Sequence, residues 1–374
     1  MRAVDVIILG GGPAGTSAAL GLARVGWSVL LLERSRSGAK RPGETLPPEV
    51  IFPLSELGLW NSFLNDGPCP SPGIVSFWGA STPSDNDFIL NPLGPGWHID
   101  RRRFDAMLSL AAKSGGAESL LHTRLTSWHR DSSGVWFLNG NAEGHRIDFQ
   151  ARVLIDATGR TSSCLHPLGG GRLIHDRLVG LVGFVQAAGG VDLRTLVEAV
   201  PIGWWYSSPL PAELYIAAFM TDADLIPRGR VSQTTFWADQ LSGAPQTRAR
   251  LGHAVEKTLV RVVGAHCSRM VIISGDGWLS AGDAASALDP LSGQGVYRAL
   301  VSGLAAARAA GDYLQGNKEA LNDYARQVSA DFAADLKAGA AYYAQERRWP
   351  SSPFWRRRHA AAEPSARFTS TLSI

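Results

Sequence analysis

The order of apolar runs and turn residues at the start of the chain predicts a strand–turn–helix–strand unit. Val4 to Leu9 form an unbroken apolar run, which is typical of a parallel strand buried on both faces. A turn of Gly10 to Gly12 follows, and the alanine-rich stretch from Pro13 to Val25 predicts a helix. Ser28 to Leu32 then predict a second buried strand, which ends at Glu33.

The rest of the chain predicts a second sheet and C-terminal helices. Short apolar runs between turn signals and stretches of β-type alternation indicate strands, and helical spacing returns in several places. Helices are expected over residues 49–64, over 104–112, from 293 onward and over 314–343. Strands are expected within 68–95, at 135–137 and 147–149 as a hairpin, at 152–155, within 178–219, and at 270–274 and 277–281.

The first turn has the spacing of a dinucleotide-binding site. Gly10, Gly12 and Gly15 stand in a GxGxxG pattern that follows a strand and opens a helix. The first glycine permits a tight turn, the second lets the backbone approach a diphosphate, and the third allows close helix–strand packing. The helix N-terminus supplies N–H donors for the anion. Glu33 can accept hydrogen bonds from a ribose, so FAD or NAD fits this site better than NADP.

A second motif lies near the C-terminal end. Gly282 and Asp283 follow an apolar run, and the segment LDPLSGQG at 288–295 precedes a helix. The helix N-terminus can stabilise the negative charge of a reduced flavin, and the proline and glycines let the backbone pass close to a planar ring. The pattern resembles the second flavin fingerprint of the glutathione-reductase-like class. That resemblance implies that the aspartate binds the ribityl chain and that the helix points at the isoalloxazine.

Two further segments are similar to parts of the flavin monooxygenases. Asp156 to Arg160 (DATGR) resembles their middle fingerprint, which lies near the cofactor diphosphate; the threonine variant is also found in halogenases and geranylgeranyl reductases. Arg101 opens a helix after Asp100, and in this superfamily such an arginine contacts the phosphate–ribityl side of the flavin. Arg102 and Arg103 are read as its solvated neighbours.

Together these motifs predict a non-covalently bound FAD. Since the sequence contains no second GxGxxG turn, the electrons are expected to come from transiently bound NAD(P)H or from a separate flavin reductase. The predicted cofactor-binding residues are Gly10, Gly12, Pro13, Ala14, Gly15, Glu33, Arg34, Arg41, Arg101, Asp156, Gly159, Gly282, Asp283, Pro290, Gly293, Gln294 and Gly295.

The expected fold is α/β: a Rossmann-like FAD-binding domain of the glutathione-reductase-like, group A monooxygenase type, with a β-sheet substrate domain and C-terminal helices. The expected divisions are 1–75, 98–165 and 270–320 for the FAD-binding domain; 76–97 and 166–269 for the substrate domain; 321–349 for a helical region; and 350–374 for a basic tail.

The composition limits which partners, metal sites and cellular locations are expected for the protein. The formal net charge of +3 gives no strong case for nucleic acid binding. The arginines at 347–348 and 356–358 are read as part of a solvated tail, with docking to an acidic partner or an anionic lipid surface as the lesser alternative. The three cysteines have no metal-ligand spacing, so no metal site is expected. The chain lacks an apolar run of about 18 residues and a signal-peptide pattern, so no membrane span and a cytoplasmic location are expected.

Three segments are similar to a narrower group of flavoproteins. They are GETLPP at 43–48, NPLGPGWH at 91–98 and GWWYSSPLP at 203–211. They resemble the maturation flavoproteins of enzymes with quinone cofactors, and a flavin monooxygenase that hydroxylates a tryptophan of such an enzyme. The resemblance implies oxygenation of an electron-rich aromatic ring through a flavin C4a-hydroperoxide. The substrate would be an aromatic small molecule or a tryptophan side chain of a partner polypeptide.

Aromatic and titratable residues in these segments are candidates for the substrate site. Large rings can line a dry pocket, although each is as readily explained as plain core. His98 is a candidate for proton transfer because its ordinary pKa lies near neutrality, and Glu44 is a candidate to bridge the cofactor and substrate regions. The predicted pocket residues are Trp78, Trp97, Trp204, Trp205 and Tyr206.

Three alternatives stay open at this stage. A reductase of prenyl double bonds would use the same flavin scaffold without oxygen. A halogenase is disfavoured because the chain has no lysine between Glu44 and Leu64, where that branch of the superfamily places one. A non-catalytic escort with this fold is also conceivable, but such escorts tend to lose the ribityl aspartate, and this chain keeps Asp283.

Overall fold

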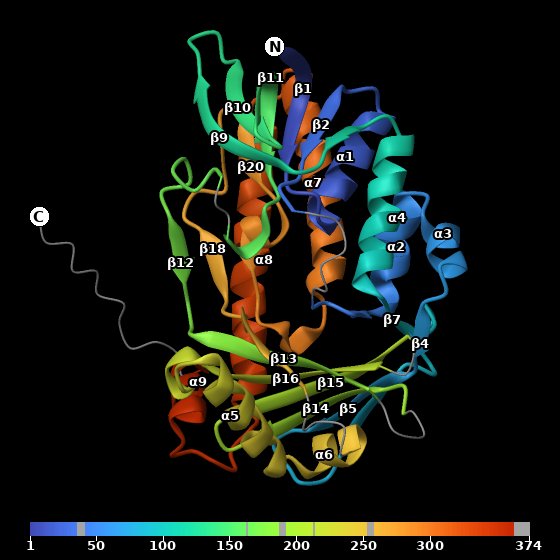
Figure 1. Cartoon of the computed structure of the whole chain (residues 1–374), viewed down its shortest axis with the longest axis vertical. Helices are drawn as coiled ribbons and strands as arrows, with labels where there is room; N and C mark the ends of the chain where they lie inside the picture. The colour runs from blue at the N-terminus through green and yellow to red at the C-terminus, as the bar shows by residue number, and fades with distance from the viewer. Residues whose placement is uncertain (36–41, 162–163, 187–191, 212–213, 253–257, 363–374) are drawn as a thin grey trace, which may run out of the picture.

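The computed structural model describes residues 1–374 except 36–41, 162–163, 187–191, 212–213, 253–257 and 363–374. Two large sheets lie one above the other, and helix α8 (Ala320–Tyr343) runs between them (Figure 1). The chain enters the upper part first, crosses to the lower part and returns, as the colours of the ribbon show.

The upper sheet has eight strands and holds the N-terminal motif. Its order is β19-β20-β11-β1-β2-β8, and β10 and β9 continue antiparallel from β11. The strands from β20 to β8 run parallel, which places their carboxyl ends at one edge. The bounds are β1 (Arg2–Leu9), β2 (Val29–Leu32), β8 (Glu118–Leu120), β9 (Thr123–Arg130), β10 (Trp136–Ala142), β11 (His145–Asp156), β19 (Ser274–Gly275) and β20 (Trp278–Ser280).

The register of the central strands brings the motif ends level. Leu9 pairs with Leu32 on one side and with Asp156 on the other. The turns that follow these residues therefore meet at the same place. Strand β11 also corrects one expectation: the hairpin strand at 147–149 and the buried strand at 152–155 are one continuous strand, because β11 pairs with β10 along its first half and with β1 along its second.

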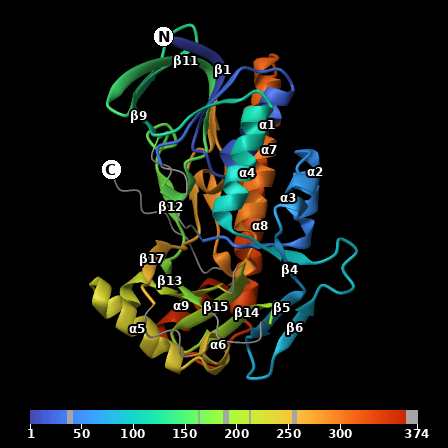
Figure 2. The ribbon, with the colours of Figure 1, turned by 45° about the vertical axis from the view of Figure 1, so that its right-hand side comes forward.

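Helices cover the upper sheet at close range (Figure 2). Helix α1 (Pro13–Arg24) packs against α7 (Gly295–Leu314) and α4 (Arg101–Ser114). The Ser17 hydroxyl reaches the Leu300 carbonyl of α7 at 3.3 Å. A Cβ at Gly303 would lie 2.2 Å from the Ala14 carbonyl oxygen, so the two helices approach closely only because this position is glycine.

The single helix expected over 49–64 is wrong. The structure has two short helices there, α2 (Ile51–Glu56) and α3 (Trp60–Asn65). Gly58 stands between them with φ +60°, a left-handed conformation that ends the first helix.

The lower sheet has seven strands in the order β17-β13-β16-β15-β14-β5-β6. Side chains alternate between its two faces, so Trp204 and Trp205 point in opposite directions. One face packs against α5 (Arg230–Ser242) and α6 (Pro245–Leu251), and the other faces the upper part of the molecule. The bounds are β5 (Gly73–Phe77), β6 (Ser84–Asp87), β13 (Leu178–Gln186), β14 (Thr195–Val200), β15 (Gly203–Leu210), β16 (Leu214–Asp222) and β17 (Arg261–Gly264).

Two small sheets lie between the large ones. The first joins β3 (Thr45–Leu46), β7 (Gly96–His98) and β4 (Cys69–Ser71), with β7 in the middle. The second joins β12 (Arg172–Ile174), β18 (Ser268–Met270) and β21 (Ser286–Ala287). The first of them carries residues of the GETLPP segment to the junction between the two large sheets.

The expected basic tail is wrong over its first part. Residues Pro353–Ala362 form helix α9, in which Phe354 and Trp355 are fully buried. Arg358 pairs with Asp222 at 2.9 Å. Charge alone suggested a solvated segment, but two large rings inside the run dock it on the lower sheet. The end of the tail, 363–374, lies outside the described residues.

Within the described residues, no helix combines the length and apolar character needed to cross a membrane. In the same part of the chain, no three His, Cys, Asp or Glu side chains gather as a metal-binding group. Burial raises the pKa of the Cys267 thiol well above its usual range. A thiol in that state is a poor nucleophile.

The packing of α9 can be tested with Trp355→Ala. Its ring packs against Trp78 and Tyr343, and its Nε1 donates to the Val200 carbonyl at 2.9 Å. We expect the free energy of unfolding to fall by about 3–5 kcal/mol in urea denaturation, as for other buried aromatic truncations. The exposed neighbour Arg356→Ala is the control and should change it by less than about 0.5 kcal/mol. Equal stability of the two variants would contradict the docked helix.

Candidate functional site

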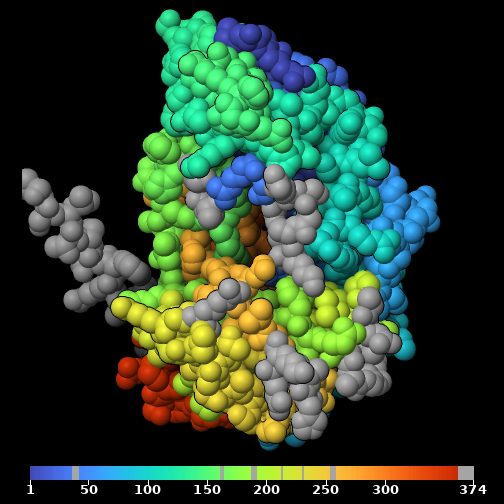
Figure 3. Space-filling view, in the orientation of Figure 1, coloured from blue at the N-terminus to red at the C-terminus, as the bar shows by residue number. Residues whose placement is uncertain are grey.

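A single large cavity lies between the upper and lower sheets. Its volume is about 1630 Å³. Small-molecule sites usually measure about 300–1,000 Å³, so this one has room for a dinucleotide and a second ligand. The space-filling view shows a recess between the upper and lower parts of the molecule (Figure 3). The upper walls come from residues within 9–14, 32–35, 42–45, 157–160, 281–283 and 288–299.

Each glycine of the first turn has a distinct environment. Gly10 has φ +107°, and a Cβ there would lie 2.4 Å from the Ala157 carbonyl oxygen. A Cβ at Gly15 would lie 1.9 Å from the Gly10 carbonyl oxygen, so this position packs α1 on the turn. A Cβ at Gly12, by contrast, would have no protein atom within 4 Å and would occupy the cavity. Gly12 therefore keeps space open for a ligand rather than for the protein.

Glu33 is held in place at the end of β2. One carboxylate oxygen accepts from the Gly11 N–H at 2.7 Å and the other from the Ser35 N–H at 2.6 Å. Glu33 and the adjacent Arg34 line the cavity, so the carboxylate is fixed where a ribose hydroxyl could donate to it. The predicted Arg41 lies outside the described residues.

Two helix N-termini open into this cavity. Gly12 precedes α1 and Gln294 precedes α7, and among the described residues no side chain caps either helix. Pro13, Gly295 and Val296 line the cavity at these ends. The backbone N–H groups that no side chain caps at these two helix ends carry partial positive charge; proline has no N–H, so at α1 they come from the residues after Pro13. The arrangement fits a cofactor with a diphosphate near one helix and an electron-rich ring near the other.

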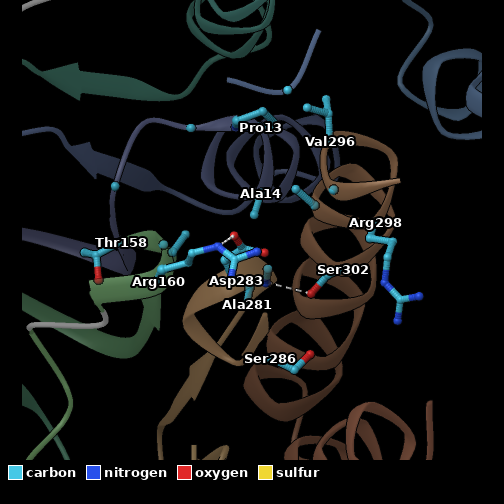
Figure 4. A pocket seen from close by; sticks show the side chains of 18 of the residues that line it. Pro13, Ala14, Thr158, Arg160, Ala281, Asp283, Ser286, Val296, Arg298 and Ser302 are labelled. Atoms are coloured by element: carbon cyan, nitrogen blue, oxygen red, sulfur yellow. Dashed lines mark hydrogen bonds and ion pairs between the residues drawn. The ribbon is translucent and has the colours of Figure 1, made fainter. Parts of the chain in front are cut away.

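The second motif is anchored by an arginine. The Asp283 carboxylate lies 3.2 Å from the Arg160 Nε, and Ser302 of α7 accepts from the Gly282 N–H at 2.8 Å (Figure 4). Arg160 also donates to the carbonyls of His266 and Leu288. Arg160 lines the cavity and belongs to the DATGR segment, but it was not among the predicted cofactor residues. Its position after a strand-end motif is the signal that could have found it.

Asp156 does not line the cavity, which corrects its predicted contact with the cofactor. Its fully buried carboxylate accepts from the N–H and hydroxyl of Thr158, at 2.9 and 2.6 Å, and from the Leu165 N–H at 3.2 Å. These bonds fold the turn that presents residues 157–160 to the cavity. Asp156 thus shapes the site from behind.

Arg101, a predicted cofactor-binding residue, lies at the cavity wall. Its Nη1 donates to the Pro42 carbonyl at 2.7 Å, and it pairs with Asp105 one turn further along α4. Gly43 has φ +109°, and a Cβ there would lie 2.5 Å from Nη1, so the chain wraps tightly around the guanidinium. The side chain is therefore preorganised beside the cavity.

Of the predicted pocket aromatics, Tyr206 alone lines the cavity. Trp78 and Trp204 pack in one core cluster with Tyr343 and the C-terminal helix; Trp97 packs against Phe63; and Trp205 lies on the opposite face of the lower sheet. The rings are core residues because neighbouring strand positions face opposite ways and because α8 and α9 cover part of the upper-facing surface.

Aliphatic residues form the floor of the cavity instead. Val182, Ala218 and Tyr206 are directly paired on three neighbouring strands, and Ile216 and Met220 flank them on β16. Their alternation in the sequence is that of any buried strand, so the sequence offered no signal to separate them from core. Among the described residues that line the cavity, none is lysine.

Glu44 and His98 occupy different places. Glu44 lines the cavity and is buried; burial raises its pKa to about 7, against the opposing effects of the Gly43 N–H and of Arg101. His98 is fully buried behind the wall, with Nδ1 2.8 Å from the Ser208 hydroxyl and Nε2 2.7 Å from the Leu193 carbonyl. Burial lowers its pKa to about 4. His98 therefore cannot transfer a proton directly to a ligand in the cavity, and this predicted role is wrong.

A series of hydrogen bonds connects the loop at 288–294, which precedes α7, to the lower sheet. The Tyr343 hydroxyl donates to Asp289 at 2.6 Å, and the Trp204 Nε1 donates to the Tyr343 oxygen at 2.9 Å. Burial raises the pKa of Asp289 to about 6. Tyr343 ends α8, so this helix fixes the loop before α7 relative to the cavity floor.

Comparison with known proteins identifies the family. The sequence profile described as "FAD binding domain" matches residues 3–336. The chain belongs to this family. It is also 28% identical over 375 residues to LodB of Marinomonas mediterranea, whose name describes it as an FAD-dependent oxidoreductase; the match covers 96% of this chain and 98% of LodB. The chain is therefore an FAD-dependent oxidoreductase, and the resemblance to the monooxygenase, halogenase and reductase superfamily is confirmed.

Solved structures confirm the α/β FAD-binding fold. The flavin-dependent halogenase CmlS is 26% identical with a TM-score of 0.86, over 96% of this chain and 68% of CmlS. The peptidyl tryptophan dihydroxylase QhpG is 25% identical with a TM-score of 0.78, over 98% of this chain and 80% of QhpG. The fold is thus shared by relatives with different chemistries.

The roles of the glycines can be separated by two matched variants. Gly12→Ala should weaken FAD binding on the order of tenfold or more while leaving the apoprotein as stable as the wild type, because its methyl group would enter only the ligand space. Gly15→Ala should lower the free energy of unfolding by about 1–3 kcal/mol, because its methyl group overlaps protein. Flavin fluorescence titration and urea denaturation measure the two effects. If Gly12→Ala binds FAD normally, the diphosphate does not lie at this turn.

Glu44 predicts a pH dependence of stability. Its pKa rises from 4.5 to about 7 on folding, so the folded state holds the proton more tightly than the unfolded chain. The contribution of Glu44 to stability is therefore lost as the pH rises through this range. Relative to the wild type, Glu44→Gln should become more stable between about pH 4.5 and 7, as measured by urea denaturation at several pH values. A stability difference independent of pH would contradict the burial of the charge.

Proposed function

We propose that this protein is a monooxygenase that hydroxylates an electron-rich aromatic ring, with a tryptophan side chain of a partner polypeptide as the leading substrate. The observation that carries the proposal is the apolar floor of Val182, Ala218 and Tyr206, which shares one cavity with the N-terminus of α7. A ring held between them would lie beside the position that suits the flavin ring. Apolar walls of this kind exclude water from the reacting atoms.

The overall reaction would convert a ring C–H, dioxygen, NAD(P)H and a proton into a ring C–OH, water and NAD(P)⁺. FAD supplies the activation of dioxygen when bound and reduced. The protein's part is to orient the ring, to keep the floor dry and to handle a proton. Glu44 suits the last role because it lines the cavity and has a pKa raised to about 7. NAD(P)H binds transiently or passes its electrons through a separate flavin reductase.

One comparison supports a polypeptide substrate. QhpG, a peptidyl tryptophan dihydroxylase by its title, covers almost the whole chain in the structural comparison. The recess at the surface also offers an extended segment a way to the cavity (Figure 3). Halogenation is disfavoured because the described lining residues lack the lysine that this chemistry uses in the superfamily.

A reductase of prenyl double bonds is the second candidate. The floor continues through Ile216, Met220 and Val263, and an elongated apolar surface also suits a prenyl chain. Dioxygen separates the two candidates, since only the monooxygenase consumes it in proportion to the substrate.

The experiment supplies the reduced holoprotein with isotope-labelled dioxygen and a tryptophan-bearing peptide. We expect oxygen uptake and labelled oxygen in the peptide by mass spectrometry. Ala218→Phe should lower product formation roughly tenfold to a hundredfold, because its ring fills the floor, while FAD binding is retained. Ala218→Ser is the matched control and keeps the floor open. Absence of oxygen uptake, or oxygen uptake that leaves the peptide unlabelled, would refute the proposal.

A further inference from the structure

Three hydroxyl groups cluster where the cavity floor meets the small sheet. The Tyr206 and Thr45 hydroxyl oxygens lie 2.6 Å apart, and Thr45 lies 3.4 Å from the Ser208 hydroxyl. Tyr206 and Thr45 line the cavity, whereas Ser208 is fully buried and bonds to His98 behind them. The cluster therefore connects the cavity surface to a histidine that no ligand can reach directly.

The hydrogen bond between His98 and Leu193, at the buried end of this series of bonds, determines which atoms donate in the others. The Leu193 carbonyl can only accept, so the His98 Nε2 at 2.7 Å must carry the proton. His98 is neutral at physiological pH, because burial and the nearby Arg250 lower its pKa to about 4. A neutral imidazole with its proton on Nε2 has an acceptor at Nδ1. The Ser208 hydroxyl must then donate to His98.

Once Ser208 is the donor to His98, the donor in each of the other hydrogen bonds of the cluster can be assigned in turn. Each hydroxyl has one proton to donate, and Ser208 uses its own on His98. The arrangement that satisfies the most groups has Thr45 donating to Ser208 and Tyr206 donating to Thr45. The Tyr206 proton then points along the cavity wall to Thr45 and is not available to a ligand. Its oxygen presents a lone pair to whatever lies on the floor.

We propose that Tyr206 is a specificity-determining residue, whose oxygen accepts a hydrogen bond from an N–H or O–H group on the aromatic substrate. This inference rests on the proposed function and narrows its substrate class to rings that carry a donor, such as indoles and phenols. The positioning residues are Thr45, Ser208 and His98, because their hydrogen bonds direct the Tyr206 proton to Thr45 and not into the cavity. Burial, and after it the nearby Glu44, raises the pKa of Tyr206, so the hydroxyl stays neutral and keeps this direction.

The test compares indole with indene, a hydrocarbon of the same shape without the N–H. Both are titrated into the oxidised holoprotein, and binding is followed by the change in the flavin absorption spectrum, so no turnover is needed. The wild type should bind indole about tenfold more tightly than indene, the value expected for one hydrogen bond to a buried acceptor. In Tyr206→Phe, which keeps the ring on the floor, the two ligands should bind about equally.

Thr45→Val tests the direction of the bonds rather than the presence of a hydroxyl. This variant has nearly the same shape but removes the group that accepts the Tyr206 proton. Tyr206 can then turn its proton toward the cavity. The preference for indole should fall, and benzofuran, whose ring oxygen accepts, should bind more tightly than to the wild type. A merely structural role of Thr45 would weaken all three ligands alike and would overturn the positioning role.

Several results would overturn the inference. Equal binding of indole and indene to the wild type, or a preference that survives in Tyr206→Phe, would remove Tyr206 as the acceptor. Loss of the preference in Glu44→Gln with its survival in Tyr206→Phe would assign the acceptor to Glu44. If neither ring binds, this inference also fails, while oxygen uptake with the peptide still decides the proposed function separately.

Discussion

The architecture depends on the parallel register of β1 with its two neighbours. Leu9 stands opposite both Leu32 and Asp156, so three strand ends reach one edge together. The Gly10 turn can then touch Ala157, and the Glu33 carboxylate can hold the Gly11 N–H. A slip by one residue would exchange the faces of a strand that is buried on both sides, and the turn, the carboxylate and the α1 N-terminus would no longer converge.

Sequence reasoning succeeded where local spacing fixes geometry. The GxGxxG turn, Glu33 and the loop before α7 were predictable because a strand, a tight turn and a helix leave few ways to arrange those residues. It failed where the outcome depends on distant packing. Trp204 and Tyr206 share one face of β15, and the packing of α8 and α9 covers Trp204 but leaves Tyr206 at the surface of the floor. The prediction of a solvated C-terminal tail was wrong for the same reason, because Phe354 and Trp355, which lie among its arginines, dock the segment.

The polar groups around the cavity form two sets. Uncapped helix N-termini and Arg101 make one part of the wall electropositive, which suits an anionic cofactor. Near Arg101, buried Glu44 and the hydroxyl cluster give acceptors and a group that can hold a proton near neutrality. The floor is aliphatic. The cavity therefore separates the part that holds charge from the part that holds an apolar ring, and their spacing is kept by the Trp204–Tyr343–Asp289 chain.

The cavity floor and the cofactor-binding turn belong to separate sheets. This separation has a consequence for how such proteins diversify. The turn belongs to the N-terminal strands of the upper sheet, while Val182, Ala218 and Tyr206 belong to the middle strands of the lower one. Inherited substitutions on the lower sheet can thus change what is recognised while the redox half stays intact. Position 218 has the smallest side chain of the three, since its alanine lies between Val182 and Tyr206 on the adjoining strands. A single scaffold can in this way give rise to lineages with unlike substrates.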